Sequence, residues 1–224
     1  MLEVSNCKVY DLKESVIACR NAMRLEMPEY IEEEFEKSLP RAIQLANTPN
    51  GSGHQTFLSG IRVSFDLKYP CYISPELQRY HWIDIVTSSS KMHKLLQMDL
   101  DMACNEWVSQ ETIDKIRRLI DDYNSMSNSD SEYGFFYLRG GKVREANSKH
   151  EKLYCQWMKI ISECPHGLEL FMRVSTNYLQ LKTLYHQRKH HKLREDWGAM
   201  CSFIESLPYA KEFIIGYENK RENI

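Results

Sequence analysis

The pattern of apolar and polar positions predicts strands and a helix in the first third of the chain. Val4 to Leu12 has the character of a first strand, and Ile61 to Leu67 alternates apolar and polar residues as a half-buried strand does. Between them, Pro28 to Ala46 reads as a helix, and Pro40 inside it is expected to produce a kink. The apolar positions at helical spacing in this segment are Ile31, Phe35, Leu39, Ile43 and Ala46.

From Pro75 onward the pattern is mostly helical, and a helical hairpin is expected to close the chain. Polar residues from 125 to 131 predict a mobile loop, residues 135–141 could form a strand that ends in a turn, and 218–224 predict a flexible tail. The expected fold class is α+β, with a small antiparallel or mixed sheet flanked by helices and a mostly helical C-terminal half. The expected helices of this part cover Pro75 to Arg79 and, approximately, residues 90–101, 110–123 and 149–161.

Length and composition favour an ordinary globular protein. The 224 residues fit one domain, 1–224, and the formal net charge of -2 provides no field that would attract nucleic acid or a membrane. No segment is apolar enough to span a bilayer and the N-terminus lacks a signal-peptide core, so we expect a cytoplasmic protein. The seven cysteines are scattered without a Cys-x-x-Cys pair, so neither a disulfide framework nor a zinc knuckle is expected, and no metal ligand is assigned.

A run of hydroxyl side chains precedes the predicted helix at 90–101. Thr87 to Lys91 combines four hydroxyls and an ammonium group at a helix start, where free backbone N–H groups favour a phosphate. Serine is also the ordinary capping residue, so the run can equally be an N-cap with spare serines. The sequence leaves both interpretations open.

One face of a later helix carries two polar side chains on an apolar stripe. Asn177, Leu181, Leu184 and Arg188 share a face at 3.6 residues per turn. A guanidinium on such a stripe needs a partner. A bound pyrimidine carbonyl, a phosphate or a carboxylate of the same chain would each serve.

The neighbouring basic run suggests two further functions. His186 and His190 have the spacing of a metal pair on a helix, and residues 186–192 could form a nucleic-acid patch. A solvated helix end is the more common meaning of such a run, because cations there complement the helix dipole.

Two blocks of sequence, read together, resemble the flavin-dependent thymidylate synthases. The first is Arg79-Tyr80-His81-x7-Ser89, where that family has Arg-His-Arg-x7-Ser. It follows Gly53-His54-Gln55-Thr56 and the Ile61 to Leu67 strand, and Glu76-Leu77-Gln78-Arg79 stands where the family has Gln-Leu-Val-Arg. The second block runs from Asn177 to Arg188 and matches the first and last residues of the family's Asn-x-Arg-x-x-x-Asn-x-x-x-Leu-Arg helix. The resemblance covers roughly 51–93 and 164–207, whereas 125–147 matches no part of the family.

Carried over residue by residue, the resemblance implies a flavin site, a nucleotide site and one catalytic residue. Arg188 would contact and polarise the pyrimidine ring. The nucleotide and its phosphate would be held by Arg188 together with Glu76, Arg79, Ser88, Ser89, Ser90 and Lys91. The flavin would lie on His54, Thr56, Arg79, Tyr80, His81 and Asn177.

The family's reaction is the methylation of dUMP to dTMP. It uses FAD, with NADPH and methylenetetrahydrofolate as co-substrates, in homotetramers whose subunits share active sites, and the resemblance implies the same here. The chain departs from the family pattern at Glu76, His81, Leu179 and Thr183, and two of these replace arginines. Each missing guanidinium should weaken the grip on FAD phosphates by about 1 to 3 kcal/mol unless other residues compensate. Arg173 could stand in for an upstream arginine of the family.

Three alternatives follow from these departures. Glu76 suggests a family member that alkylates another pyrimidine nucleotide, such as dCMP. Leu179 and His81 suggest a non-catalytic nucleotide-binding protein that has lost flavin. Pro70-Cys71 resembles the Pro-Cys nucleophile of the thiol-dependent synthases, although Tyr72 follows where those enzymes have histidine.

Overall fold

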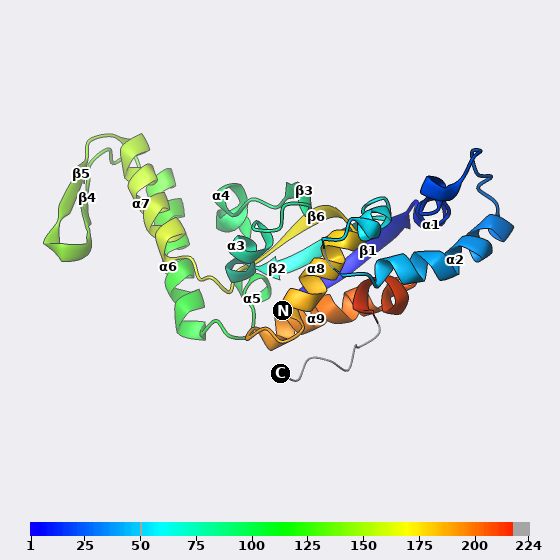
Figure 1. Ribbon diagram of the computed structural model, residues 1–224. Coiled ribbons are helices and arrows are strands. Elements are labelled where there is room, and N and C mark those ends of the chain that lie inside the picture. Colours follow the sequence, from blue (N-terminus) through cyan, green and yellow to red (C-terminus); the bar gives the residue numbers. More distant parts are fainter. Residues whose placement is uncertain (50, 217–224) are drawn as a thin grey trace. The chain divides into compact units, whose positions relative to one another are not determined.

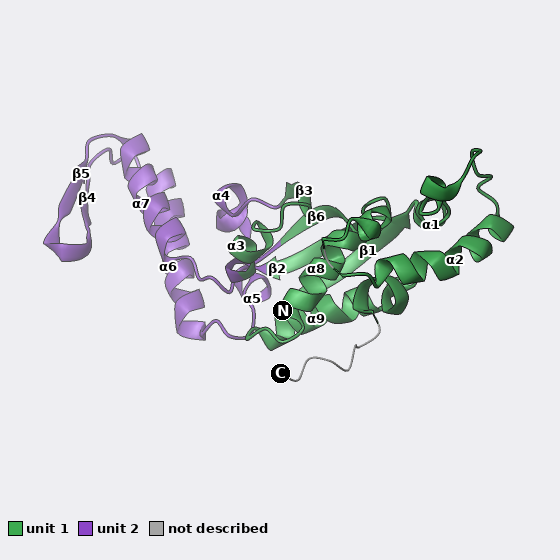
Figure 2. Ribbon diagram, in the orientation of Figure 1, with its two compact units in different colours: residues 1–69, 73–88, 171–224 green, residues 70–72, 89–170 purple. Residues whose placement is uncertain are grey.

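The chain forms two compact units in the computed structural model, which describes residues 1–49 and 51–216 (Figures 1 and 2). Unit 1 contains residues 1–69, 73–88 and 171 onward, and unit 2 contains residues 70–72 and 89–170. The mixture of helices and small sheets confirms the α+β fold class that the sequence predicts.

Unit 1 is built on a four-stranded sheet with the order β1-β2-β6-β3. The strands are β1 (Glu3–Tyr10), β2 (Arg62–Pro70), β3 (Asp84–Ser88) and β6 (Glu169–Asn177). The β1–β2 and β3–β6 pairs are antiparallel. Along β2, every second side chain from Val63 to Tyr69 is buried, as the alternation in the sequence predicts. This face of the sheet therefore carries the core of unit 1.

Helices of unit 1 supply the rest of that core. They are α1 (Leu12–Ala18), α2 (Glu32–Ala46), α3 (Ser74–Leu77), α8 (Tyr178–Arg188) and α9 (Arg194–Glu205). Phe203 of α9 packs on Phe65 of β2 with ring centroids 4.9 Å apart, and Trp197 of the same helix is fully buried. The expected hairpin of helices near the C-terminus is formed by α8 and α9.

Helix α2 differs from its prediction in its start and in its buried face. It begins at Glu32, four residues after Pro28, and it contains Pro40 as expected. Ile31 is exposed and Leu39 and Ile43 are only half-buried. Phe35 and Ala46 are buried as the sequence predicts, and the other buried positions are Ser38, Ala42 and Leu45.

Unit 2 contains a helical pair and a β-hairpin. The long helices are α6 (Gln110–Asn128) and α7 (Lys149–Glu163), and the hairpin joins β4 (Gly134–Tyr137) to β5 (Val143–Ala146). Ile113, Ile116 and Ile120 of α6 pack with Ile160 of α7. The hairpin turn contains Gly140 and Gly141 at φ 77° and 73°, which favours glycine.

Two predictions for unit 2 are wrong in detail. The single helix expected at 90–101 is two short helices, α4 (Lys91–Lys94) and α5 (Leu100–Ala103), because Asp99 starts a new helix by accepting a hydrogen bond from the Asp101 N–H. The mobile loop expected at 125–131 is partly helical, since α6 continues to Asn128. The strand expected at 135–141 is present as β4, one residue earlier and shorter.

The tail expected at 218–224 lies outside the described residues. Within residues 1–49 and 51–216, none of the helices combines the length and the apolar composition that crossing a membrane requires.

Candidate functional site

Arg188, at the end of α8, joins two parts of the chain that are far apart in sequence. Its Nε donates to the Tyr80 hydroxyl at 2.7 Å, and its Nη1 donates to Glu76 Oε2 at 2.6 Å. Glu76 lies in α3 and Tyr80 lies just after this helix, and both precede Arg188 by more than 100 residues. The fold of unit 1 thus brings Glu76 and Tyr80 of the first resembling block into contact with Arg188 of the second.

The same carboxylate oxygen collects two further contacts from the α8–α9 hairpin. The Trp197 indole Nε1 donates to Glu76 Oε2 at 3.0 Å, and His191 Nε2 lies 3.6 Å from it. The Arg188 guanidinium also lies over the Trp197 ring, 4.5 Å from its centroid. We call these five side chains, Glu76, Tyr80, Arg188, His191 and Trp197, the Arg188 cluster.

Partial burial makes the Arg188 cluster stronger than a surface ion pair. The side chains of Arg188 and Glu76 are 15% and 29% exposed, so water screens their attraction less than at an open surface. Burial raises the pKa of Tyr80, and the hydrogen bond from Arg188 opposes that rise. Tyr80 is therefore a neutral hydroxyl that accepts from the guanidinium and can donate its own proton elsewhere.

A basic cavity of about 390 Å³ opens beside Arg188. Among the described residues, its lining contains no acidic side chain and consists of Arg188, Lys189, His190, His191, Arg194 and Gly198. Such a cavity is suited to an anionic group.

The position of Arg188 follows from the way α8 is anchored. The Asn177 side chain caps the helix by accepting from the Gln180 N–H at 2.9 Å, and Leu181 and Leu184 are fully buried. The buried Lys182 ammonium donates to the Ala46 carbonyl at the end of α2, and burial lowers its pKa. The helix is therefore fixed at its start and its middle.

Contrary to the sequence prediction, Asn177 does not lie on a helix face shared with Arg188, because it is the N-cap of α8. It precedes the first helical residue, is 4% exposed, and uses its side-chain oxygen as the cap. The carboxylate partner left open for Arg188 in the sequence is present as Glu76.

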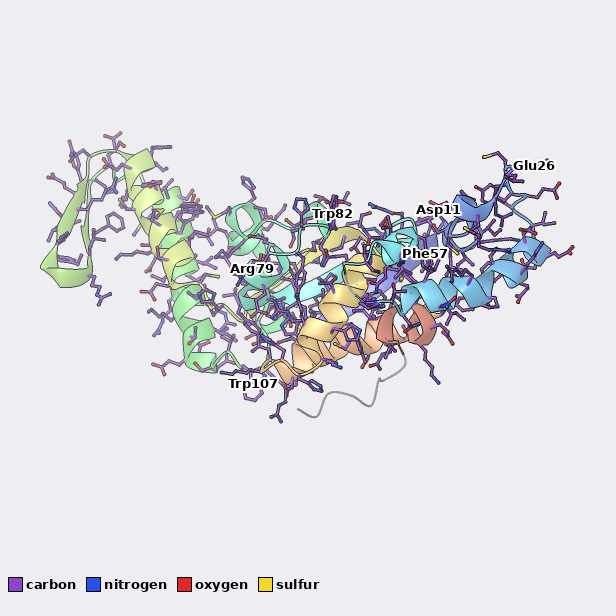
Figure 3. All side chains as sticks on the ribbon, viewed as in Figure 1. Asp11, Glu26, Phe57, Arg79, Trp82 and Trp107 are labelled. Carbon is purple, nitrogen blue, oxygen red and sulfur yellow. The ribbon has the colours of Figure 1, made fainter. Side chains whose placement is uncertain are left out.

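Arg79 and His81 are exposed on the stretch between α3 and β3, where Figure 3 labels Arg79 and Trp82. Among the described residues, no carboxylate lies within ion-pair distance of the Arg79 guanidinium. The His81 ring packs edge-on against Trp82 with centroids 4.6 Å apart. Arg79 is thus a cation available to a ligand.

His54 and Thr56 line a different cavity of unit 1, of about 1040 Å³. Both are exposed and belong to a short 3-10 helix, His54–Ser59. The Thr56 hydroxyl donates to the Gly53 carbonyl at 2.6 Å, so it offers a ligand its lone pairs in this state. No member of the Arg188 cluster lines this cavity.

The hydroxyl run is divided between a strand and a short helix. Thr87 and Ser88 end β3 and are exposed, and Ser88 pairs with Met172 of β6. Ser90 caps α4, because its hydroxyl accepts a hydrogen bond from the His93 N–H at 3.3 Å. This contact agrees with the interpretation of the serine run as an N-cap. Ser89, Ser90 and Lys91 belong to unit 2, whereas Ser88 belongs to unit 1.

The structure does not support the metal pair at His186 and His190 or the nucleophile at Cys71. Helix α8 ends at Arg188, so His190 is not one helical turn from His186, whose Nε2 contacts the Ile214 carbonyl at 3.2 Å. Within the described ranges no group of three His, Cys, Asp or Glu residues could hold a metal ion. Cys71 is half-buried against the core of unit 2, and burial raises its pKa, which disfavours the thiolate that a nucleophile requires.

Arg173 is committed to the sheet. It donates from Nη1 to Asp66 Oδ1 and to the Asn6 carbonyl, each at 3.0 Å, and thereby ties β6 to β2 and β1. The role suggested by the resemblance, replacement of a family arginine, has no support in these contacts.

Sequence reasoning missed Trp197 and His191 as neighbours of Arg188. The only signal was their position in the block that the resemblance covers. His191 lies three residues after Arg188, and Trp197 lies nine residues after it. Neither residue belongs to a motif, so only the fold of the α8–α9 hairpin reveals their contact with Glu76.

Comparison with known proteins gives structural neighbours but no sequence relatives. No family model matches the chain, and no curated protein matches it. The flavin dependent thymidylate synthase ThyX from Helicobacter pylori, complexed with FAD and dUMP, has 15% identity and a TM-score of 0.63, with 95% of this chain and 97% of that chain covered. A second structure of that enzyme with FAD and dUMP has 14% identity and a TM-score of 0.60, with coverage of 96% and 97%.

A third neighbour is the UMP/dUMP methylase PolB from Streptomyces cacaoi, bound with 5-Br dUMP. It has 10% identity and a TM-score of 0.55, with 96% of this chain and 95% of that chain covered. At these identities the likeness concerns the backbone rather than the site residues. The chain therefore has the fold of the flavin-dependent thymidylate synthases.

Proposed function

We propose that the protein is a flavin-dependent enzyme that methylates a pyrimidine deoxynucleotide at C5, with dUMP as the substrate and dTMP as the product. The observation that carries this proposal is the contact of Arg188 with Tyr80 and Glu76, which unites the two resembling blocks inside this fold. The neighbours with this fold are complexed with FAD and dUMP or with a dUMP analogue.

Arg188 is the residue that we assign to the pyrimidine. Two of its nitrogens are held by Tyr80 and Glu76, and its Nη2 has no partner among the described residues. A guanidinium fixed in this way can donate from Nη2 to a ring carbonyl without first reorganising. The Trp197 ring beneath it limits access of water and strengthens that donation.

The nucleotide phosphate would occupy the basic cavity beside Arg188 or lie on Arg79. Five of the six residues that line the cavity are Lys, Arg or His, and Arg79 has no intrachain ion pair among the described residues. Charge-assisted hydrogen bonds from guanidinium to phosphate are about twice as strong as neutral ones. Ser88, Ser89, Ser90 and Lys91 stay predictions for the same role.

FAD, when bound, would supply the hydride that completes the methyl group, with methylenetetrahydrofolate as the carbon donor and NADPH as the reductant. The residues of this chain that fit its phosphate-bearing part are His54 and Thr56, which border a cavity that no acidic residue within 1–49 and 51–216 lines. Tyr80 and Asn177 are buried and already hydrogen-bonded, so we assign them to positioning Arg188 and α8.

A cytosine nucleotide is the second candidate substrate, and Glu76 is the observation that favours it. All three of its contacts use Oε2, and Oε1 has no partner among the described residues. Cytosine presents an amino donor where uracil presents a carbonyl acceptor, so a free carboxylate oxygen suits cytosine better. The third alternative, a non-catalytic nucleotide-binding protein, differs from both because it would bind no flavin.

Two measurements test these proposals. Protein purified without added cofactor should be yellow and show a flavin spectrum. A colourless protein that FAD cannot reconstitute would contradict the flavin enzyme and favour the non-catalytic nucleotide-binding protein. Incubation with methylenetetrahydrofolate, NADPH and either dUMP or dCMP, followed by mass spectrometry of the nucleotide, identifies the substrate. A modified cytosine nucleotide and no product from dUMP would replace the first proposal with the second.

The homotetramer of the family and a cytoplasmic location are further proposals for this chain. Light scattering of the purified protein on a sizing column tests the assembly, and a monomer would contradict shared active sites. Fractionation of the source cells tests the location.

A further inference from the structure

The largest cavity among those described in unit 1 has a basic rim that no sequence motif indicates. Its volume is about 1040 Å³, and its walls come from α1 and the turn after it, from α2, and from the 3-10 helix His54–Ser59. Three cations line it, Arg20, Lys37 and Arg41, and no Asp or Glu of the described part of the chain does.

The spacing on α2 explains how two of these cations reach the same cavity. Lys37 and Arg41 are four residues apart and Leu45 follows after four more, so all three share one face of the helix. Pro40 lines the cavity from the same face. The cavity therefore meets a strip of α2 that is cationic at one end and apolar at the other.

The two arginines are not neutralised within the described part of the chain. Arg20 donates to the Lys37 carbonyl at 3.5 Å and Arg41 donates to the Gln44 side chain at 2.5 Å, and neither contact involves a carboxylate. Lys37 differs, because Glu34 lies 3.1 Å from it and also pairs with Arg24. Arg20 and Arg41 thus retain full charge for a ligand.

The thiol in the same cavity adds no negative charge. Cys19 is half-buried, and burial raises its pKa in spite of the opposing effect of the neighbouring Arg20 and Arg41. A protonated thiol cannot compete with an anionic ligand for these guanidiniums.

The remaining wall suits an aromatic or aliphatic group. Ala18, Ala22, Leu45 and Phe57 contribute apolar surface, and Figure 3 labels Phe57 in unit 1. Phe57 is held edge-on against Phe213 with centroids 5.9 Å apart. A ligand with both a strongly anionic group and a ring fits this combination.

We infer that this cavity binds a diphosphate group through Arg20 and Arg41, with Lys37 contributing, and that the group belongs to a nucleotide. The diphosphate of FAD is one source, and in that form the inference rests on the proposed function. A free nucleoside diphosphate is the other source. For FAD, these arginines would replace the two guanidiniums lost at His81 and Leu179.

The test uses calorimetric titration of the purified protein with inorganic pyrophosphate, ADP, FMN and FAD. The test variant is Arg20→Gln with Arg41→Gln, and the matched control is Arg118→Gln, an exposed arginine of α6 without an ion pair among the described residues. We expect pyrophosphate and ADP to bind roughly tenfold or more weakly to the double variant and equally to the control. Raising the salt concentration should weaken binding less in the double variant.

A conservative variant keeps the test decisive if the glutamine variant does not fold. Arg20→Lys with Arg41→Lys retains both charges but loses the forked donors, so we expect an intermediate affinity. No binding of pyrophosphate to the unaltered protein, or equal affinity in all variants, would overturn the inference.

The flavin arm separates this inference from the proposed function. FAD binding that weakens in the double variant while FMN binding does not identifies the flavin dinucleotide as the source. FAD binding that is unchanged in the double variant supports the proposed function and overturns the inference for FAD. Loss of affinity for ADP in a protein that never binds FAD supports the inference and contradicts the proposed function.

Discussion

The arginines of the two basic cavities of unit 1 differ in their partners within the chain. Beside the smaller cavity, Arg188 is paired with Glu76, hydrogen-bonded to Tyr80 and covered by Trp197. In the larger cavity, Arg20 and Arg41 have only neutral partners among the described residues. A paired guanidinium has its direction fixed before a ligand arrives, whereas an unpaired one keeps its charge for the ligand.

This difference matches two different tasks. Polarising one ring carbonyl requires a donor at a fixed place, and neutralising a phosphate requires charge more than direction. The fixed arginine therefore suits the reacting part of a substrate. The free arginines suit a group that is only held.

The largest effect is expected from removing the fixed guanidinium. Arg188→Ala should lower kcat by roughly a hundredfold or more, because one preorganised donor to a developing charge is lost. Bound flavin should stay largely in place, since FAD is assigned to other residues. Steady-state kinetics and the flavin spectrum of the purified variant measure both effects, with Arg118→Ala as the control. Full activity in Arg188→Ala would refute the role of Arg188.

Glu76→Gln should change which nucleotide is used. The amide keeps an oxygen for Trp197 and Arg188 but offers an amino donor where Oε1 was an acceptor. The ratio of kcat/KM for dUMP to that for dCMP should rise by roughly 10-fold or more. Measuring this ratio with both nucleotides decides the matter, and an unchanged ratio would show that Glu76 acts only on Arg188.

Trp197→Phe should weaken the support of Glu76 while preserving an aromatic ring near Arg188. The lost indole N–H leaves one buried hydrogen bond unmade, so the free energy of unfolding should fall by about 1 to 3 kcal/mol. Urea denaturation measures it. Trp107→Phe is the matched control, because Trp107 is 74% exposed and should tolerate the change. Equal stability losses in the two variants would argue against a specific role of the Trp197 N–H.

Local patterns predicted several of the elements but could not predict these pairings. The strands β1 and β2 and the helix α8 follow from alternation and spacing, because each signal lies within about ten residues. Strand β3 was missed because all five of its side chains are exposed and carry no alternation. The Glu76–Arg188 pair joins residues 112 apart in sequence, so no local pattern indicates it.

The candidate site was predicted in part for the same reason. Arg188 was identified through resemblance to a family helix, and the fold of that family is the one observed. The two arginines of the larger cavity, Arg20 and Arg41, belong to no motif, because the walls of this cavity meet only after folding. Arg20 and Arg41 were therefore absent from every prediction made from the sequence, whereas His54 and Thr56 of the same cavity were named through the resemblance.

The smallest effect is expected from changing Asp66, the partner of Arg173 at the sheet surface. The side-chain amide of Asn6 and the guanidinium of Arg173 both donate to Asp66 and lower its pKa below the ordinary value. A lowered pKa in the folded state contributes stability above the unfolded value, near 3.9, and that contribution is lost as pH falls through the folded value. Asp66→Asn should therefore be slightly less stable than the unaltered protein at pH 7.

Urea denaturation at pH 7 and at acidic pH measures this contribution, with Asp130→Asn, an exposed aspartate of unit 2, as the control. The difference between Asp66→Asn and the unaltered protein should shrink as the pH is lowered below about 4, because the protonated carboxyl no longer pairs with Arg173. A difference that stayed constant with pH would mean that Asp66 acts through packing rather than charge. Since this pair is open to water, its effect should be smaller than that of Trp197→Phe, which acts on the half-buried Arg188 cluster.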